Sequence, residues 1–186
     1  IIKRYYIVIK SMESKKRTYK KKDPKNSEIY SRCLLSRPVI LNILHVGKNL
    51  KSTIEKKLRA GLEGKCIVEG FVKSGSVKII SYTSGVVNGE NVRFDVSLEC
   101  EVCYPVEGMI ITCTARNITK AGIRADTTDE SPSPIVCFVS RDHHSNSSQF
   151  SAIEENQSFA CKVIGQRFEL NDKYVSVLAE LTIDKK

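Results

Sequence analysis

The chain has 186 residues, of which 41% are hydrophobic and 27% charged, with no tryptophan and a net charge of +9. This length suits one domain or two small ones, and no apolar run reaches the ~18 residues that a membrane span needs. The charge is unevenly placed, because residues 1–37 hold 12 Lys/Arg against 3 Asp/Glu, whereas residues 38–186 hold 18 of each. The neutral body argues against a broad basic surface, so a nucleic-acid site there must be local.

Residues 1–36 form a basic leader, densest in Lys15–Lys25, KKRTYKKKDPK. Like charges at this density repel one another and cannot bury a core, so we expect the leader to be disordered. A solvated tail and a tail that binds phosphates by releasing counterions fit this composition about equally well, and a nuclear-import signal fits less well. The apolar patch Tyr5–Ile9 is too short for a secretory signal and precedes lysines instead of a cleavage site.

Residues 37–105 read as a small α+β domain. A strand over Arg37–Gly47 precedes a helix that has Asn49 as its N-cap, an apolar residue at every fourth position from Leu50 to Leu62, and glycines 61 and 64 at its end. Three antiparallel strands follow, interrupted by the Gly/Asn-rich loop of residues 83–91; they cover Lys65–Val72, Ser76–Tyr82 and Val92–Val102. The last of these alternates apolar and polar residues throughout, as expected for a strand with one solvated face.

Pro105 and Gly108 mark a junction, and residues 106–186 form the second domain. Five strands are predicted there, joined by loops of unequal length: Met109–Asn117, Gly122–Asp126, Ile135–Ser140, Ser158–Arg167 and Tyr174–Leu181. Five short strands with such loops are typical of an all-β, five-stranded Greek-key barrel of the OB-fold type.

The seven cysteines are odd in number and lie mostly within apolar strand patterns, which indicates reduced, buried thiols in a cytosolic or nuclear compartment. Cys100 and Cys103 form a CxxC motif, but side chains three apart on a strand point to opposite faces. The other cysteines stand alone in the sequence, so a structural role is favoured over a metal or redox site.

The segment Arg141–His144, RDHH, holds two adjacent histidines beside an aspartate. Adjacent residues rarely converge on one metal, and the chain contains no Ser–His–Asp order, phosphate loop or HExxH motif. The segment is therefore either a solvated loop or a group of flat, cationic side chains that contact single-stranded nucleic acid. No catalytic set is visible, which indicates a binding protein without enzymatic activity and without a cofactor.

Arg124 falls on the second predicted barrel strand and Phe138 on the third, which is the face where OB barrels bind oligonucleotides. There, basic groups would follow phosphates while an aromatic ring stacks on a base. Phe138 could instead belong to the core, and nearby acidic residues such as Asp126 and Asp142 make the face mixed in charge.

The order of parts resembles the stalk subunit of multisubunit DNA-directed RNA polymerases of archaea and eukaryotes, the seventh-subunit family. The resemblance covers roughly Arg37–Leu181 and is carried by FDVSLECEVCYPVEGM, NITKAGIRAD, SPIVCFVSRDHH and VIGQRFELNDKYVSVLAEL. The last two look most similar to versions from large nucleocytoplasmic DNA viruses. Two features depart from the family pattern: its aromatic residue in the second barrel strand is replaced around Ile123–Arg124, and the basic leader lies outside it.

This resemblance implies an N-terminal tip domain that docks on the polymerase, followed by a barrel of the S-one type that receives nascent single-stranded RNA. Expected partners are the other polymerase subunits, possibly including a small heterodimer partner, and no membrane. Expected polymerase contacts are Gly61, Gly64, Thr83, Ser84, Gly85, Asn88 and Gly89. Expected phosphate contacts are Arg116, Lys120, Arg124, Arg141, His143, His144 and Lys173, and expected stacking residues are Phe138 and Tyr174.

A viral polymerase subunit would work in the host cytoplasm, in a viral factory, or in the virion, and a cellular one in the nucleus. Two other functions remain open: a freestanding RNA-binding protein with an S-one barrel, such as a translation factor, and a virion structural protein whose barrel has lost RNA binding. Co-purification with the large catalytic subunits would distinguish a polymerase subunit from a free RNA-binding protein.

Overall fold

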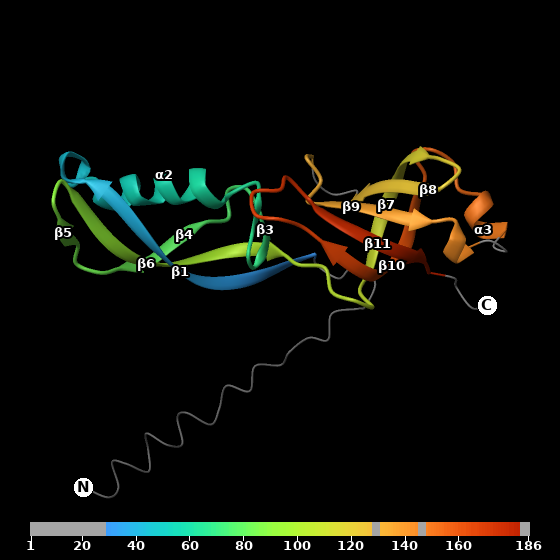
Figure 1. Ribbon diagram of the computed structural model, residues 1–186, viewed down its shortest axis with the longest axis horizontal. Coiled ribbons are helices and arrows are strands. Elements are labelled where there is room, and N and C mark those ends of the chain that lie inside the picture. Colours follow the sequence, from blue (N-terminus) through green and yellow to red (C-terminus); the bar gives the residue numbers. More distant parts are fainter. Residues whose placement is uncertain (1–28, 128–130, 145–147, 183–186) are drawn as a thin grey trace, which may run out of the picture.

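The computed structural model describes residues 29–127, 131–144 and 148–182, so most of the expected leader lies outside the described residues. The described part is elongated, with an open sheet and one long helix at one end and a closed barrel at the other (Figure 1). No helix in these ranges is long and apolar enough to cross a membrane.

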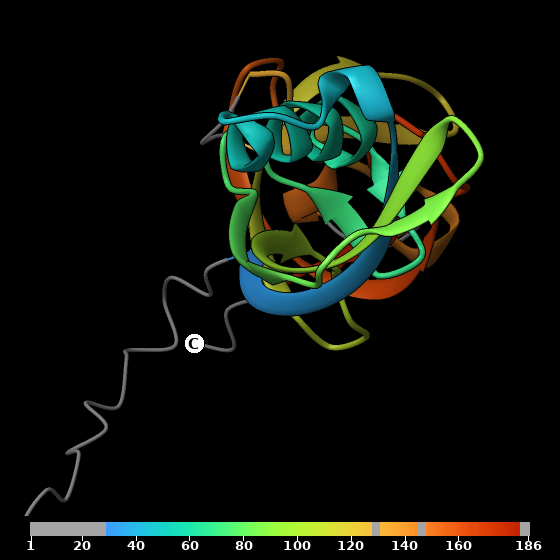
Figure 2. The same cartoon turned by 90° about the vertical axis from the view of Figure 1, so that its left-hand side faces the viewer.

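The sheet is built around two long strands, β1 (Tyr30–Asn42) and β6 (Asn91–Cys103), which pair antiparallel over their whole length. The other edge of β6 pairs with three short strands: β3 (Gly70–Val72), β4 (Lys78–Tyr82) and β5 (Val86–Asn88). β3 also pairs with β2 (Cys66–Ile67). The 3-10 helix η1 (Ile43–His45) and the helix α2 (Leu50–Leu62) connect β1 to β2. Viewed from the end that carries β5, the strands curve beneath α2 (Figure 2).

The core of the sheet follows the alternation in β6. Every second residue from Val92 to Val102 is buried, while the polar residues between them are exposed or half-buried, as the sequence predicts. Ile54 and Leu58 of α2 are buried against the same face. The helix begins after Asn49 as predicted, although the Asn49 side chain makes no capping hydrogen bond.

The predicted boundaries of the sheet need three corrections. β1 spans Tyr30–Asn42 instead of the predicted Arg37–Gly47, so residues 30–36 of the expected leader pair with the second half of β6, and residues 43–45 form η1 instead of strand. The strand predicted over residues 65–72 is a tight hairpin, because Gly70 adopts a φ of +126° that only glycine tolerates well. A Cβ on Gly70 would also lie 2.5 Å from the carbonyl oxygen of Cys103. The loop predicted over residues 83–91 contains β5.

The second half of the chain forms the predicted five-stranded closed barrel, and each strand lies within one residue of its predicted bounds. Around the barrel the order is β10-β11-β9-β8-β7, in which only the β9–β11 pair is parallel, an arrangement consistent with an OB fold. The strands are β7 (Ile110–Ile118), β8 (Gly122–Thr127), β9 (Ile135–Ser140), β10 (Ser158–Arg167) and β11 (Val175–Leu181). Between β9 and β10 lie the short helices η2 (Asp142–His144) and α3 (Ser148–Ser151).

The sheet and the barrel are joined by backbone hydrogen bonds and by a shared core. The N–H of Cys66 donates to the carbonyl of Asp172 and the N–H of Asn171 donates to the carbonyl of Cys66, each at 2.8 Å. Phe71 and Cys103, both from the sheet, are buried in the core that fills the barrel. Cys100 lies in the core of the sheet instead, so the two CxxC side chains do point to opposite faces as predicted.

Candidate nucleic-acid interface

Arg124 and Phe138 lie side by side on the outer surface of the barrel. They are cross-strand partners on β8 and β9, and Phe138 is in turn the partner of Leu178 on β11. Their neighbours along the strands, such as Ile123 and Val139, fill the interior and are fully buried. Phe138 therefore points outward, with 38% of its surface exposed. The sequence left open whether Phe138 lies on the surface or in the core, and in the structure it lies on the surface. We call this surface the β8–β9 face.

Gly122 determines how the Phe138 ring lies. A Cβ at Gly122 would sit 2.9 Å from the ring of Phe138 and 2.3 Å from the carbonyl oxygen of Val139. Only a residue without a side chain lets β9 and the ring approach the start of β8 this closely. The ring is thus held against the strand with one side available to solvent.

The two arginines of this region differ in their partners. Arg116 sits in a β-bulge of β7, and its guanidinium lies 3.5 Å from a carboxylate oxygen of Asp126 and 3.4 Å from the side-chain oxygen of Asn156. Arg124 is exposed and makes no ion pair or hydrogen bond through its side chain within the described residues. Arg124 is therefore the cation that is free to bind a phosphate next to the aromatic ring.

Arg141 has a structural role in the position where the sequence predicts a phosphate contact. Its Nε donates to the carbonyl of Lys120 at 2.9 Å and its Nη2 donates to the carbonyl of Thr119 at 3.4 Å. Its guanidinium also lies 5.0 Å from the centre of the Phe150 ring, in reach of a cation–π interaction. Arg141 thereby fixes the β7–β8 loop, from which the side chain of Lys120 extends into solvent.

The two histidines have opposite environments, and the expectation that both contact phosphate is wrong for His144. His144 is buried, its Nδ1 lies 2.8 Å from the carbonyl oxygen of Ser140, and its Nε2 accepts the N–H of Leu181 at 2.9 Å. Because Nε2 accepts, Nδ1 is the ring nitrogen that donates to Ser140. The ring also stacks on Phe150 at a centroid distance of 5.3 Å. His143 is exposed and stays a candidate.

Lys173 and Tyr174 immediately precede β11. Since Val175 is the partner of Ile135, they lie near the start of β9, at the opposite end of this strand from Arg141. Lys173 is exposed and Tyr174 is 40% exposed. Lys120, Arg141 and His143 thus lie near one end of the β8–β9 face and Lys173 and Tyr174 near the other, with Arg124 and Phe138 between them.

The expected polymerase contacts separate into two groups. Five of them surround β5 at the end of the sheet farthest from the barrel (Figure 1): Thr83, Ser84, Gly85, Asn88 and Gly89. Gly61 and Gly64 lie at the other end of α2, where the N–H of Gly64 donates to the carbonyl of Val72 at 2.9 Å. One surface cannot include both groups without also covering most of α2.

The end of the sheet near β5 carries exposed apolar side chains that the sequence analysis did not single out. Leu44 is 88% exposed, and Val86 and Val87 are each more than 60% exposed. The N–H of Ile43 donates to the carbonyl of Glu90, which holds η1 against the β5–β6 turn. We call the set Ile43, Leu44, Val46, Val86 and Val87 the distal end. Its signal in the sequence is the apolar run ILHV at the end of the first predicted strand and the apolar residues of VVN in a predicted loop.

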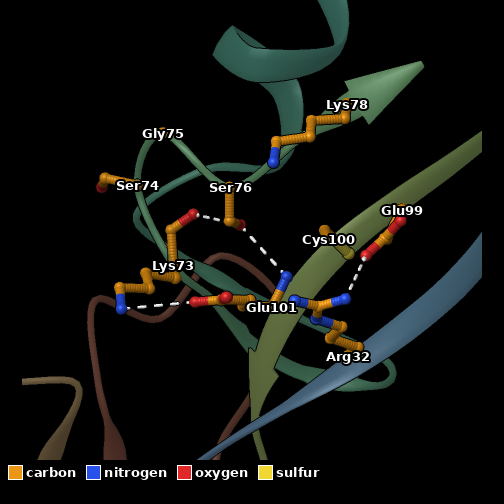
Figure 3. Close-up of a pocket in the computed structure, with 9 residues that line it drawn as sticks. All are labelled: Arg32, Lys73, Ser74, Gly75, Ser76, Lys78, Glu99, Cys100 and Glu101. Carbon is orange, nitrogen blue, oxygen red and sulfur yellow. Dashed lines mark hydrogen bonds and ion pairs between the residues drawn. The ribbon is translucent and has the colours of Figure 1, made fainter.

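A polar pocket of about 320 Å³ opens where the turn of residues 73–76 faces β1 and β6 (Figure 3). Its charges are largely matched, because Arg32 pairs with Glu99 at 3.7 Å and Lys73 pairs with Glu101 at 3.3 Å. The hydroxyl of Ser76 is also used, since it accepts the N–H of Glu101. The side chains satisfy one another instead of converging on a common point, so the pocket supports no particular ligand.

Three cysteines that stand apart in the sequence meet inside the barrel: Cys113, Cys137 and Cys161. The pKa of Cys137 is raised by its hydrogen bonds to the other two thiols and by burial. The pKa of Cys161 is lowered by its hydrogen bonds to the thiols of Cys113 and Cys137. The sequence analysis missed this cluster, because residues on three strands converge only when the barrel closes.

The described residues therefore present the exposed pair of Phe138 and Arg124 on an OB-like barrel, an apolar distal end on the sheet, and a cluster of thiols in the barrel core. A scan against protein-family models and a search of curated proteins found no match for this chain.

Proposed function

We propose that the chain is a non-catalytic stalk subunit of a DNA-directed RNA polymerase, of viral origin, in which the barrel contacts nascent RNA and the sheet docks on the polymerase core. The observation that carries the proposal is the exposed pair of Phe138 and Arg124 on the second and third strands of the barrel. The sequence resemblance to the stalk family supports the assignment of the sheet as the tip domain.

RNA binding would combine stacking on Phe138 with phosphate contacts from Arg124. Stacking of a base on an aromatic side chain is worth about 1–3 kcal/mol in single-strand binding proteins. A strand that follows the face would meet Tyr174 and Lys173 near one end of β9 and Lys120 and His143 near the other. Because Arg116 is already paired with Asp126, few cations are free, and we expect modest affinity with a shallow salt dependence.

Docking would use the distal end. Exposed apolar residues that gather in one place commonly mark protein–protein contacts, and the distal end places four of them on η1 and β5 and a fifth, Val46, directly after η1. Thr83, Ser84 and Gly85 on the same side would extend this contact. Gly61 and Gly64 lie too far along α2 to share it and are not part of the proposed surface.

RNA binding is tested by fluorescence anisotropy with a labelled single-stranded RNA and the full chain. We expect Phe138→Ala to weaken binding roughly tenfold, since a tenfold change corresponds to about 1.4 kcal/mol. Arg124→Ala should reduce the slope of log K against log salt by about 0.7, the contribution of one phosphate contact. Lys162→Ala is the control for loss of a positive charge elsewhere on the barrel, because Lys162 is an exposed cation on β10 that pairs with Glu180 at 3.0 Å, outside the β8–β9 face. If both variants bind RNA as tightly and with the same salt dependence as the wild type, the proposal that the β8–β9 face binds RNA is wrong.

Docking is tested by co-purification of a tagged chain, with the catalytic polymerase subunits identified among the bound proteins. Leu44→Asp combined with Val87→Asp should abolish their recovery, whereas Val68→Asp should not, because Val68 is equally exposed but lies on the β2–β3 turn near the barrel. RNA binding without the catalytic subunits would instead favour a freestanding RNA-binding protein. If the chain neither binds RNA nor recovers the catalytic subunits, the result would favour a structural protein of the virion.

A further inference from the structure

The interior of the barrel contains three sulfur atoms in mutual contact, which we call the trithiol cluster: Cys113 on β7, Cys137 on β9 and Cys161 on β10. All three side chains are fully buried. The sulfur of Cys113 lies 3.2 Å from that of Cys137 and 3.8 Å from that of Cys161. The three sulfurs all lie within 4.8 Å of one another, and all three cysteines are free thiols.

These separations match the spacing of sulfur ligands around one metal ion. A metal–sulfur bond of about 2.3 Å places two ligands of a tetrahedral or trigonal centre roughly 3.8–4.0 Å apart. The cluster therefore needs adjustments of less than about an ångström to hold an ion, which side-chain rotation can supply. A disulfide would need a sulfur–sulfur distance of about 2.05 Å, which is much shorter than any separation in the cluster.

We propose that the trithiol cluster binds one soft, thiophilic metal ion, and that its three-ligand geometry favours monovalent copper. Thiolate sulfur selects Cu(I) and Zn²⁺ among the common ions, but structural zinc sites almost always have four protein ligands. Within the described residues no fourth His, Cys, Asp or Glu joins the group. The cluster is surrounded by Ile111, Ile135 and Val163 instead.

Loading of the cluster follows thiolate chemistry, because a thiol coordinates a metal ion as its thiolate. Binding one Cu(I) through all three sulfurs breaks three S–H bonds, forms three Cu–S bonds and releases three protons to solvent. The affinity for copper is therefore expected to rise with pH.

A bound ion would cross-link three strands that are far apart in the sequence. Cys137 is 24 residues and Cys161 is 48 residues from Cys113. Because the cluster is enclosed, loading is expected during folding or through transient opening of the barrel, and the ion would stabilise the folded state by mass action.

The test uses the reduced, metal-free full chain, titrated with Cu(I) in competition with a chromogenic chelator, both in the folded state and during refolding. We expect one equivalent to bind and the melting temperature to rise. Cys137→Ala should lower the affinity at least 100-fold and remove the rise. Cys100→Ala is the matched control, since Cys100 is also a buried strand cysteine but lies in the core of the sheet. A parallel titration with Zn²⁺ should show weaker binding.

X-ray absorption of the copper-loaded wild-type chain should show three sulfur neighbours, and this measurement does not depend on how the variants fold. Fewer than three sulfurs around copper, or equal affinity in wild type and Cys137→Ala, would overturn the proposed site. Tighter binding of Zn²⁺ than of Cu(I) would overturn the assignment of the ion.

Discussion

Replacing His144 by alanine removes a side chain that ties the end of β9 to the end of β11. Its Nδ1 donates to the carbonyl of Ser140 and its Nε2 accepts the N–H of Leu181. Without the imidazole, the buried N–H of Leu181 has no acceptor, which costs about 1–3 kcal/mol. The lost stacking on Phe150 costs a further ~0.5–1.5 kcal/mol.

The expected loss of unfolding free energy for His144→Ala is therefore about 2–4 kcal/mol. For a chain of this size, 1 kcal/mol shifts the melting temperature by about 2–4 °C, so a decrease of roughly 5–15 °C is expected. His143→Ala is the control, because the neighbouring histidine is exposed and an exposed substitution should change stability by no more than about 0.5 kcal/mol.

Thermal and urea unfolding of the wild type and the two variants, followed by circular dichroism, measure this difference. Melting temperatures of His144→Ala and His143→Ala within about 1 °C of each other would refute the structural role assigned to His144. Such a result would also reopen the expectation, corrected here, that both histidines are available to RNA.

Two further changes test the barrel and its junction with the sheet. Gly122→Ala should destabilise the chain by about 1–3 kcal/mol in urea unfolding, because the added Cβ would lie 2.3 Å from a backbone oxygen, whereas Gly165→Ala, with open space at its Cβ, should be far milder. Burial, together with the carboxylate of Asp172, raises the pKa of Cys66 from an ordinary 9.0 to about 11. The folded state therefore favours the neutral thiol, so this contribution to stability is complete below pH 9 and is lost as the pH rises towards 11. Cys66→Ala should lose less stability than the wild type between pH 9 and pH 11 in unfolding titrations, and equal losses would contradict the shift.

The sequence predicted the strands best where alternation and turn residues agree. β6 alternates without interruption from Val92 to Val102, and the barrel strands are bounded by glycine, proline or polar loops. The sequence does not predict the start of β1, because residues 30–36, with Arg32 among them, belong to the expected basic leader. In the structure Arg32 pairs with Glu99 and Arg37 pairs with Glu69, and a charge count along the chain does not reveal ion pairs between strands.

The site was less predictable, because its properties depend on how the barrel closes. Phe138 faces outward because its neighbours Cys137 and Val139 fill the interior. The alternation of residues in the sequence does not reveal which side of β9 faces the interior. His143 and His144 are adjacent in the sequence, and only the turn of η2 directs one to solvent and the other towards β11.

The backbone of Cys66 is bonded in both directions to the connection between β10 and β11, so the sheet and the barrel meet through a short piece of shared ladder. These bonds, together with the shared core around Phe71 and Cys103, oppose bending between the sheet and the barrel. A partner that moves the distal end would therefore also move the β8–β9 face. A substitution that weakens the hydrogen bonds of Cys66 would let the sheet and the barrel move independently while each stays folded.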